Sequence, residues 1–234
     1  MTTAPASAAS HGPMHHEVQV FDDLDTLSTA AARYVVGRAR EAVQASGSFH
    51  FAVSGGRSPW QMFARLTVMD MPWDDTVIWQ VDERVAPVDD PERNLAHLRQ
   101  ALGGRSSEIR PMPVDDADLD DAALRYGEEL PPRLDLVHLG IGPDGHTASL
   151  VPGDPVLDVT DRPVAVTEGE YEGRRRMTLT YPALAQAGQL LWLVTGQDKR
   201  AALDAMLAGD RSIPAGRVVA QASLVLADRA AHPS

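Results

Sequence analysis

The fold is decided by the stretch Leu136-Val-His-Leu-Gly-Ile-Gly-Pro-Asp-Gly-His-Thr-Ala-Ser-Leu-Val-Pro-Gly153. It begins as a short apolar run of the kind that forms a buried strand, and glycines break the run at Gly140 and Gly142. Glycine allows a positive φ or a close approach of the backbone to a ligand. Asp144 and His146 follow, and a carboxylate two residues from an imidazole can carry out proton transfer. The stretch therefore predicts a strand end that carries a titratable pair on a bent turn.

Length and composition predict a soluble α/β protein and exclude several classes of function. The 234 residues are 44% hydrophobic and 23% charged. The chain has no cysteine, so a disulfide, a thiolate metal site and a cysteine nucleophile are excluded, and a cytoplasmic location is expected. The net charge of −12 argues against nucleic acid and anionic membranes as partners. A small anionic substrate would need a local cluster of cations.

The first residues of the chain differ in composition from the rest. Residues 1–15 are rich in Ala, Ser, Thr and Pro, and they contain neither the basic segment nor the apolar segment of a signal peptide. We expect a disordered N-terminal tail over residues 1–15 and a single α/β domain over residues 16–234.

Strand patterns alternate with helix patterns along the chain. We expect strands at Glu17–Phe21, Phe49–Val53, Thr76–Val81, Ile109–Val114, Leu134–Leu139, Pro163–Val166, Arg176–Thr180, Gln189–Val194 and near Leu224–Leu226. We expect helices at Asp25–Ser46, Pro59–Leu66, Asn94–Leu102, Leu119–Leu130, Tyr181–Ala187 and Gln197–Leu207. This alternation predicts a Rossmann-like α/β fold, with a mostly parallel sheet covered by helices on both faces.

Ligands of such sheets bind outside the carboxyl ends of the strands. The turns after Val53, Val81, Leu139 and Val194 should therefore converge on one site. In the first of them, Ser54-Gly-Gly-Arg-Ser-Pro59, two glycines precede a helix whose N-cap we expect to be Ser58. Backbone N–H groups at such a helix start form a phosphate cradle. A tight turn without a ligand is the alternative.

The other turns supply charged side chains. Asp82-Glu83-Arg84 ends one strand, and either a solvated strand end or an internal ion pair would also explain it. Arg176 opens an apolar strand, which should aim it differently from the two arginines before it. Lys199, the one lysine of the sequence, follows a glycine turn in the first turn of a helix, where a surface lysine is the alternative.

His146 is the candidate general base, and Asp144 the residue that could orient it. The alternative is that His146 caps the next helix and Asp144 shapes the turn. His138 lies within the buried strand pattern, so a core histidine is favoured over a ligand there. Beyond residue 16, no pair of histidines has the spacing of a helical metal site, and we expect no metal and no cofactor.

Together these turns resemble the 6-phosphogluconolactonase family, within a wider group that includes glucosamine-6-phosphate deaminases. The resemblance covers residues 17–227, and the motif around His146 is its most specific part. The matching motifs are Ser54-Gly-Gly-Arg-Ser-Pro59, Asp82-Glu-Arg84, Gly140-Ile-Gly-Pro-Asp-Gly-His-Thr-Ala-Ser149, Arg176-Met-Thr-Leu-Thr180 and Gly196-Gln-Asp-Lys199.

Two positions depart from the family pattern. Ser58 stands where the family usually has Thr, which keeps the hydroxyl. Val151 stands where lactonases often have an aromatic residue and where deaminases of this fold usually carry Glu as a partner of the catalytic histidine. Because valine cannot share a proton, the resemblance favours the lactonase branch.

The resemblance implies hydrolysis of 6-phospho-D-glucono-1,5-lactone to 6-phospho-D-gluconate in the pentose phosphate pathway. His146 would activate water, Arg84 or a backbone N–H would stabilise the oxyanion, and Asp82 and Asp144 would order the sugar or the imidazole. The implied substrate-binding residues, with Arg176 and Lys199 on the phosphate, are Ser54, Gly55, Gly56, Arg57, Ser58, Gly142, Gly145, Thr147, Arg176 and Lys199. Arg93 is a further cation expected near the strand ends.

Two alternatives belong to other classes: a sugar-phosphate deaminase or isomerase of the glucosamine-6-phosphate type, and a non-catalytic sugar-phosphate-binding regulator. The phosphorylated sugar lactone is the partner we expect. We expect a monomer, with a homodimer as the alternative.

Overall fold

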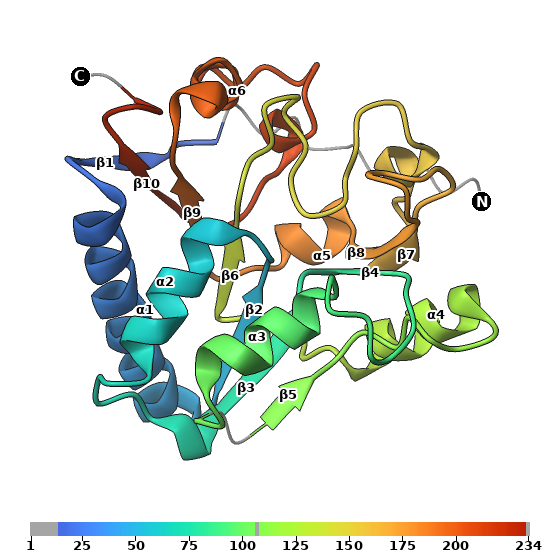
Figure 1. The fold of residues 1–234 in the computed structure, drawn as a ribbon, viewed down its shortest axis with the longest axis horizontal. Helices are drawn as coiled ribbons and strands as arrows, with labels where there is room; N and C mark the ends of the chain where they lie inside the picture. The colour runs from blue at the N-terminus through green and yellow to red at the C-terminus, as the bar shows by residue number, and fades with distance from the viewer. Residues whose placement is uncertain (1–13, 106–107, 233–234) are drawn as a thin grey trace, which may run out of the picture.

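The computed structural model describes residues 14–105 and 108–232, except for the side chain of Arg57 (Figure 1). Most of the tail expected over residues 1–15 lies outside the described residues. Of the helices in the described ranges, none has the length and hydropathy that crossing a bilayer requires.

The elements of the described residues agree closely with those expected. The strands are β1 (Glu17–Phe21), β2 (Phe49–Val53), β3 (Thr76–Gln80), β4 (Asp82–Arg84), β5 (Glu108–Arg110), β6 (Leu136–Leu139), β7 (Val164–Val166), β8 (Arg176–Leu179), β9 (Leu190–Val194) and β10 (Ser223–Asp228). The α-helices are α1 (Leu24–Ser46), α2 (Arg57–Leu66), α3 (Asn94–Leu102), α4 (Leu119–Glu129), α5 (Tyr181–Ala185) and α6 (Arg200–Leu207).

A parallel sheet forms the centre of the fold, with strand order β1-β10-β9-β6-β2-β3-β5. The chain moves outward from β2 to β3 and β5, and then returns to β6 on the other side of β2. The strand order thus reverses between β2 and β6, the kind of position where α/β sheets bind ligands. The predicted fold class, an α/β fold with a mostly parallel sheet, is confirmed.

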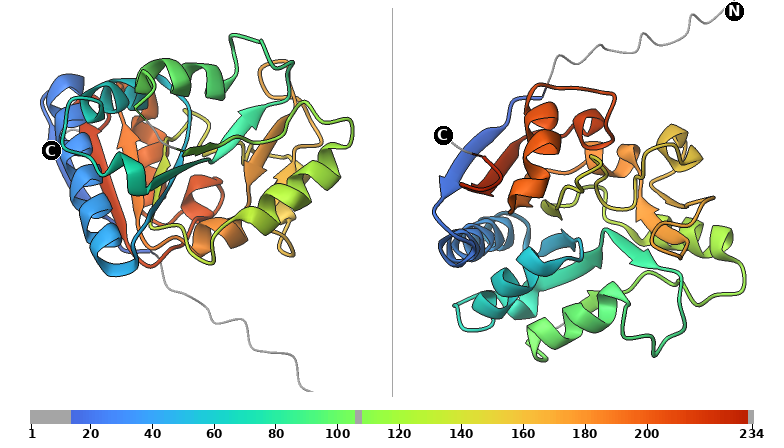
Figure 2. Two further views of the ribbon diagram at one scale, coloured as in Figure 1. Left: turned by 90° about the horizontal axis from the view of Figure 1, so that it is seen from below. Right: turned by 45° about the horizontal axis from the view of Figure 1, so that its top comes forward.

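Alternating side chains along the central strands pack against opposite layers. Phe49, Phe51 and Val53 of β2 face the apolar cluster of α1, α2 and α3, whereas Ala52 faces the cluster of α4, α5 and α6. Successive residues of a strand point to opposite faces, so a strand buried on both sides is apolar throughout. Figures 1 and 2 show the two groups of helices on opposite faces of the sheet.

One expectation was wrong in detail. The strands β7 and β8, together with β4, form a separate antiparallel sheet of order β4-β8-β7 instead of extending the central one. A short connection without a helix joins β7 to β8, and antiparallel neighbours need no more than that. β4, expected as the polar end of β3, turns away to pair with β8, with Arg84 opposite Arg176.

Glu83 fixes the position of β4 against α3. Its buried carboxylate accepts the backbone N–H groups of Asn94 and Leu95 at 2.7 and 2.8 Å, at the start of α3. A negative charge is favourable at this end of a helix dipole. Because Glu83 points toward α3, its neighbours Asp82 and Arg84 point to the other side of β4, toward the cleft described next.

Candidate active site

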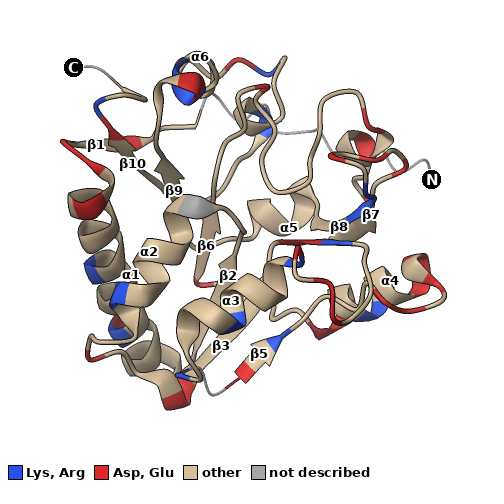
Figure 3. Ribbon diagram, viewed as in Figure 1, with Lys and Arg blue, Asp and Glu red and all other residues tan. Residues whose placement is uncertain are grey.

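A cleft of about 1150 Å³ lies at the carboxyl ends of the central strands. Its walls come from the turns after β2, β6 and β9, from β4, and from the segment that leads into β8. The structure therefore brings the four predicted turns together. The small sheet closes the cleft on one side, and Figure 3 shows acidic and basic residues adjacent along its strand β4.

The floor of the cleft lies where β2 and β6 separate. Their pairing ends at Ala52 and Val137, and beyond it the Ser54 hydroxyl donates to the carbonyl of His138 at 3.1 Å. The Ser54 N–H lies 3.4 Å from Nδ1 of His138. Burial lowers the pKa of His138 to about 3, so its ring is neutral and can accept at Nδ1. His138 is thus a buried histidine that joins the two strands.

Gly55, the first glycine of the turn after β2, packs directly against the side chain of Asn94. A Cβ on Gly55 would lie 2.3 Å from Oδ1 of Asn94. Gly56 has φ 123° and is the N-cap of α2, so the expectation that Ser58 caps this helix was wrong. The Ser58 hydroxyl instead lies 2.7 Å from that of Thr195, joining α2 to the end of β9. The start of α2 borders the cleft, where its free N–H groups favour an anion.

The turn after β9 brings Lys199 to the cleft. Gly196 has φ 98°, and its N–H donates to both carboxylate oxygens of Asp228 at 3.1 Å. Lys199 ends a short 3₁₀ helix rather than lying in the first turn of an α-helix as expected. Its Nζ lies 3.2 Å from the carboxylate of Asp198.

The turn after β6 holds His146 and Asp144 in contact. Nδ1 of His146 lies 2.6 Å from Oδ1 of Asp144, which also accepts the His146 backbone N–H at 3.2 Å. Partial burial acts to raise the pKa of Asp144, but these hydrogen bonds outweigh it and hold the pKa below its ordinary value. Gly142 makes the arrangement possible, because a Cβ there would lie 2.0 Å from Nδ1.

The charge of Asp144 decides which nitrogen of His146 carries the proton. An ionised carboxylate can only accept, so Nδ1 of a neutral His146 must be the donor. The lone pair is then left on Nε2, the nitrogen that can act as a base. The ring of Tyr171 packs on His146 with the centroids 4.9 Å apart, and its hydroxyl lies 3.3 Å from Nδ1.

Asp82 is almost fully buried in the cleft wall. Burial raises its pKa, while the hydrogen bond from Ser149 at 2.7 Å and the positive charge of Arg176 act against this rise. The amide of Asn94 donates to the Asp82 carbonyl at 3.0 Å. Asp82 is thus held by neighbours from α3 and from the turn after β6.

Two arginines lie side by side on the small sheet. Arg84 donates through Nη1 to the Glu92 carbonyl at 2.8 Å and to Oδ1 of Asn94 at 2.9 Å. Arg176 donates through Nη2 to the Tyr171 carbonyl at 3.0 Å and to the Glu172 carboxylate at 3.2 Å. The side chain of Arg176 is only 6% exposed, and its Nε has no partner among the described residues.

Three residues proposed from the sequence lie elsewhere. Thr147 is fully buried, and its hydroxyl donates to the Gly140 carbonyl. Gly145 packs against Ile213 with φ 81° and shapes the turn. Arg93 is buried, 3.7 Å from a carboxylate oxygen of Glu83, and so is not a cation of the cleft wall. The Arg57 side chain lies outside what the structure describes. Within residues 14–105 and 108–232, no group of His, Cys, Asp and Glu has the arrangement of a metal site.

The polar residues of the cleft that were not proposed from the sequence include Asn94, Tyr171, Glu172 and Thr195. Asn94 begins α3 and Thr195 follows the last residue of β9, so in the sequence each indicates only the end of an element. Tyr171 and Glu172 lie in the loop before β8, where Gly169 and Gly173 are the residues that indicate turns. Their contacts are with segments distant in the sequence, which a single sequence does not show.

Comparisons with known proteins agree on one family. The family model for glucosamine-6-phosphate isomerases/6-phosphogluconolactonase matches residues 22–226. A 6-phosphogluconolactonase of Mycobacterium tuberculosis is 35% identical, over 92% of this chain and 97% of that protein. One of Synechocystis is 33% identical, over 91% of this chain and 95% of that protein.

Solved structures share the fold at lower identity. The 6-phosphogluconolactonase from Thermotoga maritima matches with a TM-score of 0.83 and 22% identity, over 92% of this chain and 100% of that one. A monomeric glucosamine-6-phosphate deaminase matches with a TM-score of 0.79 and 19% identity, over 92% and 98%. Since both branches share the fold, it does not separate them.

Gly142→Ala should displace His146 from Asp144, because the new Cβ would overlap the imidazole. We expect a loss of about 1–3 kcal/mol in the free energy of unfolding. We also expect the loss of the Nδ1–H tautomer, measured by ¹⁵N NMR of the histidine side chains. Gly140→Ala is the matched control, because a Cβ there meets nothing within 4 Å. An unchanged His146 tautomer in Gly142→Ala would contradict this description of the turn.

Proposed function

This chain belongs to the glucosamine-6-phosphate isomerase/6-phosphogluconolactonase family, and we propose that it hydrolyses 6-phospho-D-glucono-1,5-lactone to 6-phospho-D-gluconate. One observation supports this most: Asp144 lies 2.6 Å from His146, and His146 borders the same cleft as Arg176 and Lys199. Hydrolysis of a phosphorylated lactone requires a base that can activate water and a positively charged site that binds the phosphate.

The deaminase alternative finds no support at the position that separates the branches. Deaminases of this fold usually use a Glu there as a partner of the histidine, and this chain has Val151. In the structure His146 is partnered by Asp144 and Tyr171. These partners suit a base that activates water.

The phosphate would bind at the two glycine turns. The N-terminus of α2, with the Ser54–Ser58 turn before it, offers N–H groups and a positive helix end. Arg176 and Lys199 border the same cleft and would add two positive charges. The phosphate then serves as the anchor that places the lactone ring toward His146.

His146 would act twice in the reaction. Its Nε2 takes a proton from water as the water oxygen attacks C1, and the negative charge moves to the carbonyl oxygen. Arg84 or a backbone N–H of the turn after β6 would stabilise this oxyanion. The tetrahedral intermediate then breaks the bond between C1 and the ring oxygen, and the imidazolium returns its proton to that oxygen. Asp144 favours the imidazolium while it exists, and Asp82 would order sugar hydroxyls.

Three further properties belong to the same proposal. We propose that residues 16–234 form one lactonase domain, because one apolar cluster contains residues of both sheets, such as Trp192 and Met177. A cytoplasmic location rests on the cysteine-free composition. A monomer is the expected state, and sedimentation would distinguish it from a homodimer.

His146→Ala should lower kcat by about 10²–10⁴, the usual contribution of a general base, with little change in KM. The assay uses freshly made 6-phosphogluconolactone and subtracts spontaneous hydrolysis. His232→Ala, a change of histidine outside the cleft wall, should leave kcat within about twofold of wild type. A His146→Ala enzyme with near-normal kcat would refute the role of His146 as the base.

Lys199→Ala should mainly raise KM, by about tenfold, because it removes a charged partner of the phosphate. Arg200→Ala is the matched control, since Arg200 donates to the Ala230 carbonyl and is not part of the cleft wall. If wild type hydrolysed the phosphate-free lactone equally well, the proposal of a phosphate site would be wrong.

A further inference from the structure

A tight hairpin turn before β8 carries a carboxylate to the two arginines. Tyr171 and Arg174 form an isolated antiparallel bridge, with the Tyr171 N–H donating to the Arg174 carbonyl at 2.9 Å. Glu172 and Gly173 between them have φ of 53° and 76°. Two consecutive left-handed residues are the requirement of a type I′ hairpin turn, which favours Asn and Gly. Glutamate in this conformation is uncommon, and backbone strain of this kind concentrates at functional sites.

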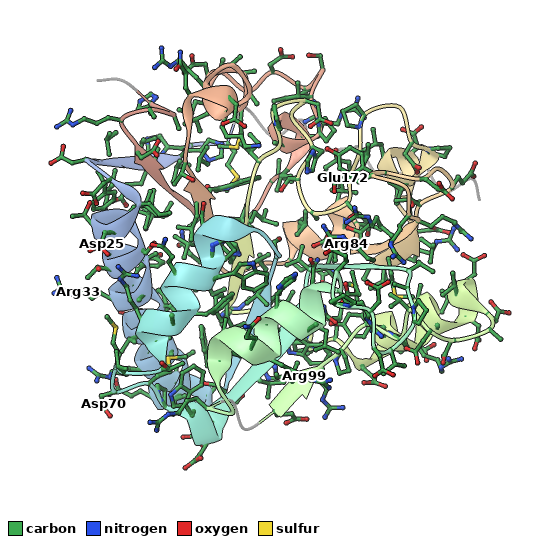
Figure 4. The ribbon with its side chains drawn as sticks, viewed as in Figure 1. Asp25, Arg33, Asp70, Arg84, Arg99 and Glu172 are labelled. Atoms are coloured by element: carbon green, nitrogen blue, oxygen red, sulfur yellow. The ribbon has the colours of Figure 1, made fainter. Side chains whose placement is uncertain are left out.

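The Glu172 carboxylate lies against both arginines of the small sheet. One of its oxygens is 3.2 Å from Nη2 of Arg176 and 3.8 Å from Nη2 of Arg84. Figure 4 labels Arg84 and Glu172, which belong to β4 and to the loop before β8. All three side chains border the cleft. Glu172 thus lies where an anionic group of a ligand would bind.

The contact with Glu172 does not satisfy every hydrogen-bond donor of the Arg176 guanidinium. Glu172 accepts from Nη2 alone, and the Nε of this buried arginine has no partner among the described residues. An oxyanion such as a phosphate can accept from Nε and Nη2 together, as planar guanidinium groups favour. Such a ligand would satisfy the unpaired Nε donor. The Glu172 side chain is 64% exposed, so it can move into solvent with little loss of free energy.

We propose that Glu172 is an internal competitor for the anion site at Arg176, beside Arg84, and that it sets the affinity of the cleft for phosphorylated ligands. The inference rests on the proposed function, because the ligand anion that displaces Glu172 is the phosphate of the proposed substrate. The side chains of Glu172, Arg84 and Arg176 together carry a net charge of +1, and removal of the Glu172 carboxylate raises the sum to +2. Through Glu172, the hairpin Tyr171–Arg174 determines the affinity of the cleft for phosphorylated ligands.

The test is calorimetric titration of the full chain with inorganic phosphate and with 6-phosphogluconate, without turnover. Glu172→Gln should lower Kd for both ligands by about three- to tenfold. Glu170→Gln is the matched control, since Glu170 is an exposed carboxylate of the same loop outside the cleft wall, and it should leave Kd unchanged. The gain of Glu172→Gln should shrink as the salt concentration rises.

Glu172→Gly provides a second variant that removes the carboxylate and suits the positive φ at this position. Both Glu172 variants should bind phosphate more tightly than wild type. Unchanged Kd values, or an equal shift in Glu170→Gln, would overturn the proposal. The titration needs no turnover, so its outcome does not depend on lactonase activity. A missing lactonase activity would refute the proposed function, whereas unchanged Kd values would refute the role of Glu172.

Discussion

The hydrogen bond between Asp144 and His146 is the interaction on which the account of the site depends. It joins two residues of one turn at 2.6 Å, and it fixes both the orientation and the tautomer of the imidazole. The turn is fixed in its own right, because Gly142 leaves room for the ring and the Thr147 hydroxyl donates to the Gly140 carbonyl. The base is therefore held by backbone geometry before any ligand arrives.

A second constraint comes from charge. The chain carries a net charge of −12, yet the proposed substrate is an anion. Cations of the cleft have internal carboxylates as partners: Lys199 contacts Asp198, and Arg176 contacts Glu172. A phosphate would thus exchange with these carboxylates as well as with water. The affinity of the cleft depends on how strongly each internal pair holds together, which makes Glu172 as relevant as the arginines.

Much of the fold could be predicted because strand and helix signals are local. The strands alternate with helices, which predicts a parallel sheet and places Ser54, Gly140 and Lys199 at one edge. The separate antiparallel sheet could not be predicted in this way. Arg176 opens β8 in either arrangement, and only the pairing of β8 with β4 across the fold decides which sheet it joins.

The same limit explains the residues that were misplaced or missed. Ser58 has the features of an N-cap, but α2 starts two residues earlier than expected, with Gly56 as its N-cap. The Ser58 hydroxyl instead contacts Thr195. Tyr171 meets His146 across 25 residues of chain. Contacts of this kind depend on the packed structure, so one sequence cannot reveal them.

The role of the Asp144–His146 pair is tested most directly by the kcat of Asp144→Asn on freshly made 6-phosphogluconolactone. The asparagine amide keeps the shape of the carboxylate but can donate to Nδ1, which would place the ring proton on Nε2. We expect kcat to fall by about 10²–10⁴, with a folded protein and a nearly unchanged KM. A kcat within about twofold of wild type would contradict this role.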